Sequence, residues 1–121
     1  MPYKRGAVVL VLFPDSNLRT AKRRPALVIQ SNDLNTGLGQ TIVAMITSNM
    51  KRAGHSSRVT LLLNSSEGKE SRILMDSVVM TDNLATIGES EIDRELGRLN
   101  DMSGVNNALR HTLGLQGNRS F

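Results

Sequence analysis

The chain of 121 residues contains no cysteine, which excludes disulfides, thiolate metal sites and cysteine nucleophiles together. Aromatic residues are scarce, with one tyrosine, two phenylalanines and no tryptophan. A protein that holds single strands mainly by base stacking needs more of them. The N-terminal apolar run at residues 6–14 is far shorter than a membrane span, and no small-residue cleavage site follows it. We therefore expect a soluble, cytoplasmic protein with one domain over residues 1–121.

Acidic residues are rare in the first half of the chain. Residues 1–58 contain nine Lys and Arg but only two acidic residues, whereas residues 59–121 contain six basic and nine acidic residues. Such an asymmetry is typical of a protein with a face that binds a polyanion. An uneven but inert surface charge explains it equally well, so charge alone leaves both interpretations open.

The common motifs of cofactor and metal sites are also missing. The sequence has no G-x-G-x-x-G, no P-loop and no G-x-S-x-G, which argues against nucleotide cofactors and against a hydrolase nucleophile elbow. Its two histidines, His55 and His111, lie in no ligand-like spacing with Asp or Glu. We expect neither a cofactor nor a metal ion.

Short apolar runs separated by turn-forming residues indicate a mainly β protein. Five strands are predicted, at residues 6–14, 25–31, 41–48, 58–63 and 71–82. The first is a continuous apolar run, which predicts burial on both faces, or nearly so. Hairpin-length connections, such as the turn predicted at 64–70, favour a small antiparallel barrel or sandwich.

The C-terminal part contains one clear helix and one ambiguous segment. Asn100 or Asp101 is expected to cap a helix that buries one apolar face and ends at Gly114. Residues 89–99 fit either a helix or a short turn followed by a strand, and periodicity does not decide between them.

The stretch KRRP places three cations against the start of a strand. Because Pro25 follows it, the backbone of Arg24 is restricted to extended conformations, which lowers the entropy lost in aiming its side chain. Its planar guanidinium suits a phosphate group. A lone arginine in this place is more often a solvated cation, but Lys22 and Arg23 strengthen the phosphate interpretation.

Two further segments place polar groups at the ends of strands. MITSN ends in Thr47, Ser48 and Asn49, and Lys51 and Arg52 follow, so these side chains could hold phosphate oxygens; an ordinary Ser/Thr turn is the simpler interpretation. In MDSVVMTDNLATI, Asp76 and Asp82 interrupt an apolar strand, and such a carboxylate is either a proton acceptor or half of a structural ion pair.

In their order and spacing, the segments RGAVVLVLFP, KRRPALVIQ, TIVAMITSN and DSVVMTDNLATI resemble the MazF/PemK toxins of bacterial toxin–antitoxin pairs. The resemblance covers nearly the whole chain. It implies an SH3-like barrel of the CcdB/PemK type with five to seven mostly antiparallel strands and a C-terminal helix. For residues 89–99 it favours the turn and strand.

The resemblance further implies a homodimeric endoribonuclease, an mRNA interferase. It would cut single-stranded RNA at short sequences without a metal ion and be silenced by a cognate antitoxin. The arginine before the proline of the second strand, Arg24, and the threonine that ends the third, Thr47, match catalytic positions, and Asp82 matches a carboxylate used by some members. The expected substrate-binding residues are Lys22, Arg23, Ser48, Asn49, Lys51, Arg52 and Ser77, and we expect His55 and Arg58 to extend the same groove.

Three positions depart from the family pattern. Ala7 stands where an acidic residue is usual, and Met80 and Ala85 stand where arginines are usual. These departures keep two alternatives open. One is a gyrase poison of the CcdB type, which shares the fold; the other is a degenerate toxin that binds antitoxin or RNA without cutting.

Overall fold

In the computed structural model, which describes residues 3–14 and 21–115, the N-terminal apolar run forms strand β1 (Ala7–Pro14). Its side chains alternate between two hydrophobic clusters: Val9 and Val11 belong to one, and Val8 belongs to the other. All three are fully buried. The prediction that this strand is buried on both faces, or nearly so, holds for its first half, whereas Leu10 is only partly buried and Leu12 is 46% exposed.

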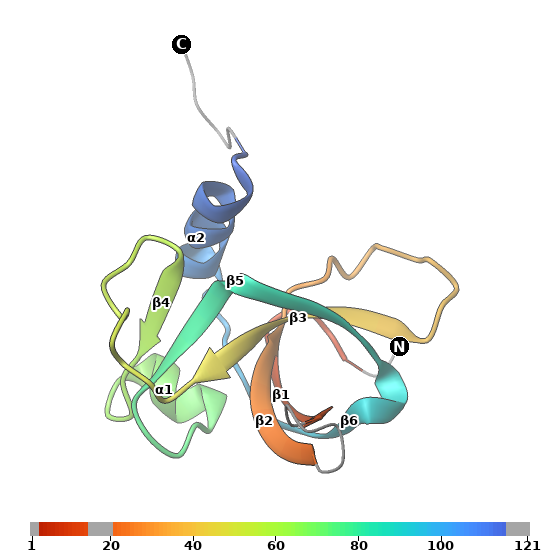
Figure 1. Ribbon diagram of the computed structural model, residues 1–121, viewed down its shortest axis with the longest axis horizontal. Coiled ribbons are helices and arrows are strands. Elements are labelled where there is room, and N and C mark those ends of the chain that lie inside the picture. The colour runs from red at the N-terminus through yellow and green to blue at the C-terminus, as the bar shows by residue number, and fades with distance from the viewer. Residues whose placement is uncertain (1–2, 15–20, 116–121) are drawn as a thin grey trace.

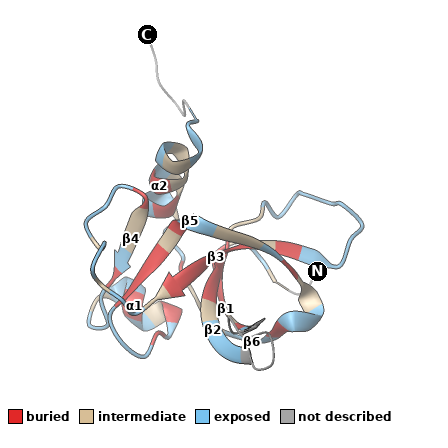
Figure 2. Cartoon of the chain, viewed as in Figure 1, coloured by how far each residue is buried: buried red, intermediate tan, exposed pale blue. Residues whose placement is uncertain are grey.

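Six strands form one antiparallel sheet in the order β4-β5-β3-β2-β1-β6. The sheet curls strongly, so that its ends approach the same core (Figure 1). Figure 2 shows the buried residues concentrated along its central strands. The mainly β prediction, with five to seven antiparallel strands and a C-terminal helix, is confirmed. After β1, the strands are β2 (Ala21–Val28), β3 (Gln40–Thr47), β4 (Arg58–Leu61), β5 (Ser77–Gly88) and β6 (Ile92–Arg98).

Strand β2 begins earlier than predicted. The sequence placed its start at Pro25, but β2 includes Lys22, Arg23 and Arg24, which pair with residues of β1. The two-residue period of the strand explains this. Ile29 donates its N–H to Ile42 O on the β3 side, so position 25 also faces β3, and the N–H that Pro25 lacks is not needed for pairing with β1.

The segment predicted as a turn at residues 64–70 contains a short helix, α1 (Ser66–Ser71). Ser65 caps it by accepting a hydrogen bond from Gly68 N, at 3.0 Å. The predicted fifth strand was therefore wrong at its start, because residues 71–76 complete α1 and turn into β5. It was also too short, since β5 continues to Gly88.

The helix predicted near the C-terminus is α2 (Ser103–Leu113), and it ends at Gly114 in the left-handed conformation, φ 71°, as expected. The expectation that Asn100 or Asp101 caps the helix was wrong, because the N-cap is Met102, which makes no side-chain cap hydrogen bond. Asp101, one residue earlier, accepts hydrogen bonds from Ser103 N and Oγ, whereas Asn100 bonds Glu70. Neither α1 nor α2, the two α-helices of the described residues, is long and apolar enough to span a membrane.

Residues 89–99 follow the second of the two alternatives. A single 3-10 turn, η1 (Glu89–Glu91), leads into β6, which pairs with β1. The unpaired edge of β1 decides the outcome, because it offers hydrogen bonds that a helix at this place would leave unsatisfied.

Candidate functional site

Strands β2 and β3 separate at the position of Pro25. Their pairing ends at Ala26 and Met45, because the next N–H of β2 that should face β3 belongs to the proline and is missing. When the register is continued past this point, Arg24 lies opposite Thr47, and Arg23 lies opposite Ser48. The two strongest sequence candidates therefore meet where the sheet opens.

A cavity of about 320 Å³ occupies this opening. Five of the predicted site residues line it: Arg23, Arg24, Thr47, Ser48 and Ser77. Its remaining lining residues are mainly apolar and come from β1, β2, β3, β6 and the segment after α1: Leu10, Pro25, Ile46, Arg72, Ile73, Leu74, Met75 and Leu96. No carboxylate is among these lining residues, so the site is positively charged and suited to an anion.

Two of the hydroxyl groups in the cavity already have a partner in the chain. Thr47 Oγ1 accepts a hydrogen bond from Asn49 N, at 3.1 Å, and therefore keeps its own proton to donate to a ligand. Ser77 Oγ donates to Met75 O, at 2.8 Å. Thr47 is consequently held with its oxygen fixed and its donor free, which suits a contact with a phosphate oxygen.

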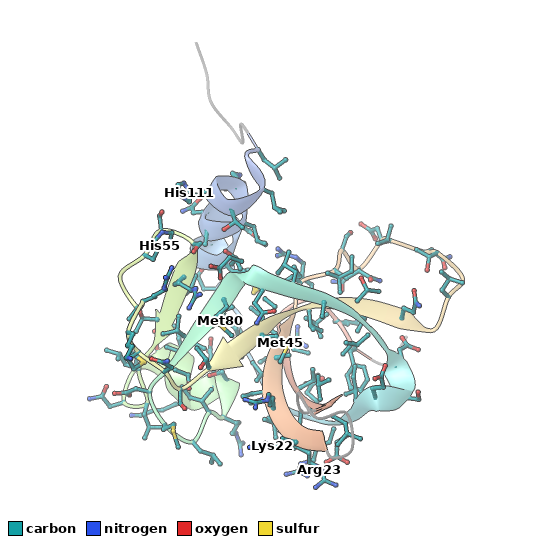
Figure 3. The ribbon with its side chains drawn as sticks, in the orientation of Figure 1. Lys22, Arg23, Met45, His55, Met80 and His111 are labelled. Atoms are coloured by element: carbon teal, nitrogen blue, oxygen red, sulfur yellow. The ribbon has the colours of Figure 1, made fainter. Side chains whose placement is uncertain are left out.

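The cations of KRRP differ in their surroundings. Arg23 Nε lies 3.3 Å from Asp93 Oδ2, so part of its charge is balanced by β6. Lys22 is exposed and does not line the cavity; Figure 3 shows it beside Arg23 at the end of β2. Among the described residues, Arg24 forms no ion pair within 4.0 Å, which leaves its guanidinium available to a substrate.

Beyond Ser48, the loop after β3 does not contribute to the cavity. Asn49, Lys51 and Arg52 are not among the lining residues. The side chain of Asn49 accepts from Lys51 N, at 3.1 Å, and so stabilises the turn itself. Lys51 and Arg52 are exposed just beyond the end of β3, where they could contact only a substrate that extends past the opening.

Asp82 lies elsewhere on the sheet. It accepts hydrogen bonds from Arg58 Nε at 2.9 Å and Nη2 at 3.2 Å, and these lower the pKa of the Asp82 carboxyl below its usual value. Ser77, at the cavity, is five residues away along β5, roughly 15 Å of extended chain. The structure thus does not bring Asp82 to Arg24, and its geometry is that of the ion-pair alternative.

The register of β5 explains where Asp82 lies. Ala44 pairs with Leu84, but the next residue, Met45, pairs with Met80. The residues between, 81–83, have no partner in β3 and bulge toward β4 and α2. Thr81 accordingly bonds Ser57 O and the hydroxyl of Thr112 on α2.

His55 and Arg58, which we expected to extend the groove, do not line the cavity. Arg58 is committed to Asp82, and His55 contacts Ser57, at 2.7 Å, and lies edge-to-face with His111 at a centroid distance of 6.4 Å. Figure 3 shows the two histidines near α2, away from Lys22 and Arg23. Within the described part of the chain, no three His, Cys, Asp or Glu side chains are grouped so that they could hold a metal ion.

The ion pair between Arg58 and Asp82 should make the stability of the fold depend on pH in the acid range. Because the folded pKa of Asp82 is lowered, the stabilisation is present above the unfolded pKa of about 3.9 and is lost as the pH falls through the folded pKa. We expect Asp82→Asn to lower the free energy of unfolding at pH 7 by at most about 1 kcal/mol, as for an exposed pair. Urea midpoints at pH 7 and pH 3 measure this, and the gap between the two proteins should shrink at pH 3.

The same variant tests the position of Asp82. A general base contributes roughly a hundred- to ten-thousandfold to the rate of a catalysed reaction. A loss of catalytic rate of that size in Asp82→Asn would contradict the purely structural ion-pair role. Asp101→Asn is a control, since the pKa of Asp101 is also lowered, by hydrogen bonds from Ser103.

Sequence reasoning missed one charged residue and the apolar floor of the site. Arg72 was read as the beginning of a strand, but it ends α1 and lines the cavity. Leu10, Ile46 and Leu96 form the floor, although each looks like an ordinary strand residue in the sequence. These residues come together only in the three-dimensional structure, so no local sequence signal could have identified this apolar floor.

Comparison with known proteins agrees with the fold. The model of the PemK-like, MazF-like toxins of type II toxin–antitoxin systems matches residues 4–113. The chain is 35% identical over 107 residues to the endoribonuclease MazF2 of Mycobacterium bovis and, to the same extent, to the endoribonuclease MazF6 of Mycobacterium tuberculosis. In both cases the match covers 86% of this chain and 90% of the relative.

Solved structures show the same fold at lower identity. A MazE–MazF complex from Deinococcus radiodurans superposes with a TM-score of 0.72 at 23% identity, covering 96% of this chain and all of the other. A mycobacterial endoribonuclease in complex with its cognate antitoxin gives a TM-score of 0.71 at 23% identity, covering 93% and 96%. The family model that matches residues 4–113 and the curated relatives at 35% identity establish that the chain belongs to the PemK-like, MazF-like toxin family of type II toxin–antitoxin systems.

Proposed function

We propose that this protein is an endoribonuclease toxin that cuts single-stranded RNA at short sequences, without a metal ion, and is neutralised by a cognate antitoxin. The observation that carries this proposal is the cavity shared by Arg24 and Thr47. A gyrase poison of the same fold needs neither residue. The curated relatives of this chain are named endoribonucleases, which supports cleavage over binding alone.

RNA supplies its own nucleophile, so the protein's task is to position the phosphate and stabilise charge. The 2′-oxygen attacks the neighbouring phosphorus; a 2′-O–P bond forms and the P–O5′ bond breaks. An arginine side chain stays protonated in proteins, so Arg24 would stabilise the charge that develops on the phosphate oxygens. Thr47 would donate its hydroxyl proton to one of them.

Two protons must also move, one from the 2′-hydroxyl and one to the departing 5′-oxygen. Because Asp82, in the middle of β5, is paired with Arg58 of β4, we assign these transfers to water in the open cavity. The expected products are a 2′,3′-cyclic phosphate and a 5′-hydroxyl, because the nucleophile belongs to the RNA itself.

The test is a cleavage assay on a long, mixed-sequence, single-stranded RNA in excess EDTA, with both new ends mapped. Discrete cuts that leave 5′-hydroxyl ends are expected. Products with a 5′-phosphate, or cutting that stops in EDTA, would contradict the mechanism. A substrate with 2′-deoxyribose at the mapped position should resist cleavage, since it lacks the nucleophile.

The proposal extends to partners and location. Antitoxin complexes are known for the similar structures from Deinococcus radiodurans and a mycobacterial species, which supports an antitoxin partner here. We propose that the protein acts as a homodimer in the cytoplasm, where its RNA substrates are found. Light scattering of the purified chain measures the oligomer directly.

A further inference from the structure

Arg72 has an unusual backbone conformation for its residue type. It ends α1 with φ 61° and ψ 30°, and it is the one non-glycine residue with a positive φ within residues 3–14 and 21–115. This left-handed conformation normally selects glycine or asparagine, since other side chains are strained there. Strained residues cluster at functional sites, so the choice of arginine at this position calls for an explanation.

The surroundings of Arg72 fix its stem beside the cavity. A Cβ at position 97 would lie 2.7 Å from Arg72 Cγ and would clash with the carbonyl oxygen of Glu70. Gly97 of β6 therefore allows the end of α1 to pack against the sheet. The side chain of Glu70 accepts two hydrogen bonds from Asn100, at 3.0 and 3.1 Å, which hold this end of α1 in place.

Arg72 adds a third cation to the cavity from a different side. Arg23 and Arg24 come from β2, whereas Arg72 comes from the connection between α1 and β5; Figure 1 shows these elements on either side of the end of β3. Among the described residues, Arg72 forms no ion pair within 4.0 Å. Three guanidinium groups exceed what one phosphate needs, since a single arginine can bind a phosphate through two parallel hydrogen bonds.

We propose that Arg72 binds a second phosphate of the RNA, adjacent to the one held by Arg24 and Thr47. This inference rests on the proposed function and adds a substrate contact to the same site. The strand would cross the opening from β2 to the end of α1, over the apolar floor formed by Leu10, Ile46 and Leu96. The contacts at the end of α1 hold Arg72 in this conformation, in which it lines the cavity.

The conformation of Arg72 provides a clean test, because Arg72→Gly and Arg72→Asn remove the charge while fitting the backbone. The probe is a fluorescent 2′-O-methyl oligoribonucleotide pool of mixed sequence, which cannot be cut. Fluorescence anisotropy over a series of salt concentrations gives Kd and its salt dependence. We expect both variants to keep or raise the melting temperature and to bind roughly tenfold more weakly, the low end for a hydrogen bond to a charged group. The slope of log K against log salt should flatten by about 0.7, as for one lost phosphate contact on a single strand.

Two controls separate this contact from general effects. Arg110→Ala removes the same charge from α2, outside the lining of the cavity, and its salt slope should match that of the native protein. Arg72→Lys keeps a charge without the planar group and should bind with intermediate affinity. Stable Arg72→Gly and Arg72→Asn proteins with native Kd and salt slope would overturn the proposal.

The binding readout is independent of cleavage. If the native protein binds the pool through Arg72 but cuts no RNA, the proposed function fails and the phosphate contact stands. If RNA is cut, Arg72→Asn should raise KM by more than it lowers kcat, because the contact forms before the chemical step. An equal loss in kcat with unchanged KM would overturn the assignment of Arg72 to binding.

Discussion

Arg24→Ala should lower the rate of RNA cleavage about a hundred- to a thousandfold, the usual cost of removing a positioned donor from a developing oxyanion. The side chain is exposed at the opening between β2 and β3, so its loss leaves the buried core unchanged. We therefore expect the melting temperature of the variant to stay close to that of the native protein. Single-turnover kinetics with excess enzyme measure the chemical step.

Two further variants refine the role of Arg24. Arg24→Lys keeps the charge but loses the planar fork, so its rate should lie between those of the native protein and Arg24→Ala. Arg110→Ala, which removes an arginine from α2, should cut at the native rate. A folded Arg24→Ala protein that cleaves within about threefold of the native rate would be inconsistent with the oxyanion role.

Thr47→Val should lower cleavage by roughly ten- to a hundredfold, the equivalent of one hydrogen bond to a charged group. Valine has nearly the same shape and suits a strand, so β3 should form as before. The substitution removes the hydroxyl that accepts from Asn49 N and that would donate to the phosphate. Circular dichroism and thermal unfolding verify the fold, and the same single-turnover assay measures the loss.

Thr47→Ser is the matched variant, because it restores the hydroxyl and removes only a methyl group. It should recover most of the activity that Thr47→Val loses. Equal activity of the Val and Ser variants would show that the hydroxyl takes no part in the reaction, and the loss would then lie in the packing of β3.

Local features of the chain determined much of the fold. The continuous apolar run at residues 6–14 predicted a strand buried on both faces, and β1 contributes to both hydrophobic clusters. Gly114 predicted the end of the C-terminal helix, because glycine adopts the left-handed conformation without strain. KRRP and TSN indicated an anion site, since each places donors directly beside a strand. These properties depend on residues that are close together in the chain, so they can be predicted from the sequence.

Tertiary structure alone decided how the pieces of the site combine. Because β2 pairs with β1, it extends on the N-terminal side of Pro25 to Ala21. Residues 92–98 form a strand because they pair with the other edge of β1. A shift in the register of β5 directed Asp82 to Arg58 rather than to Arg24. The packing of α1 on Gly97 brought Arg72 to the cavity. Each outcome depends on hydrogen bonds or close contacts between segments far apart in the chain, and the local pattern of apolar and polar residues does not encode which distant partner is chosen.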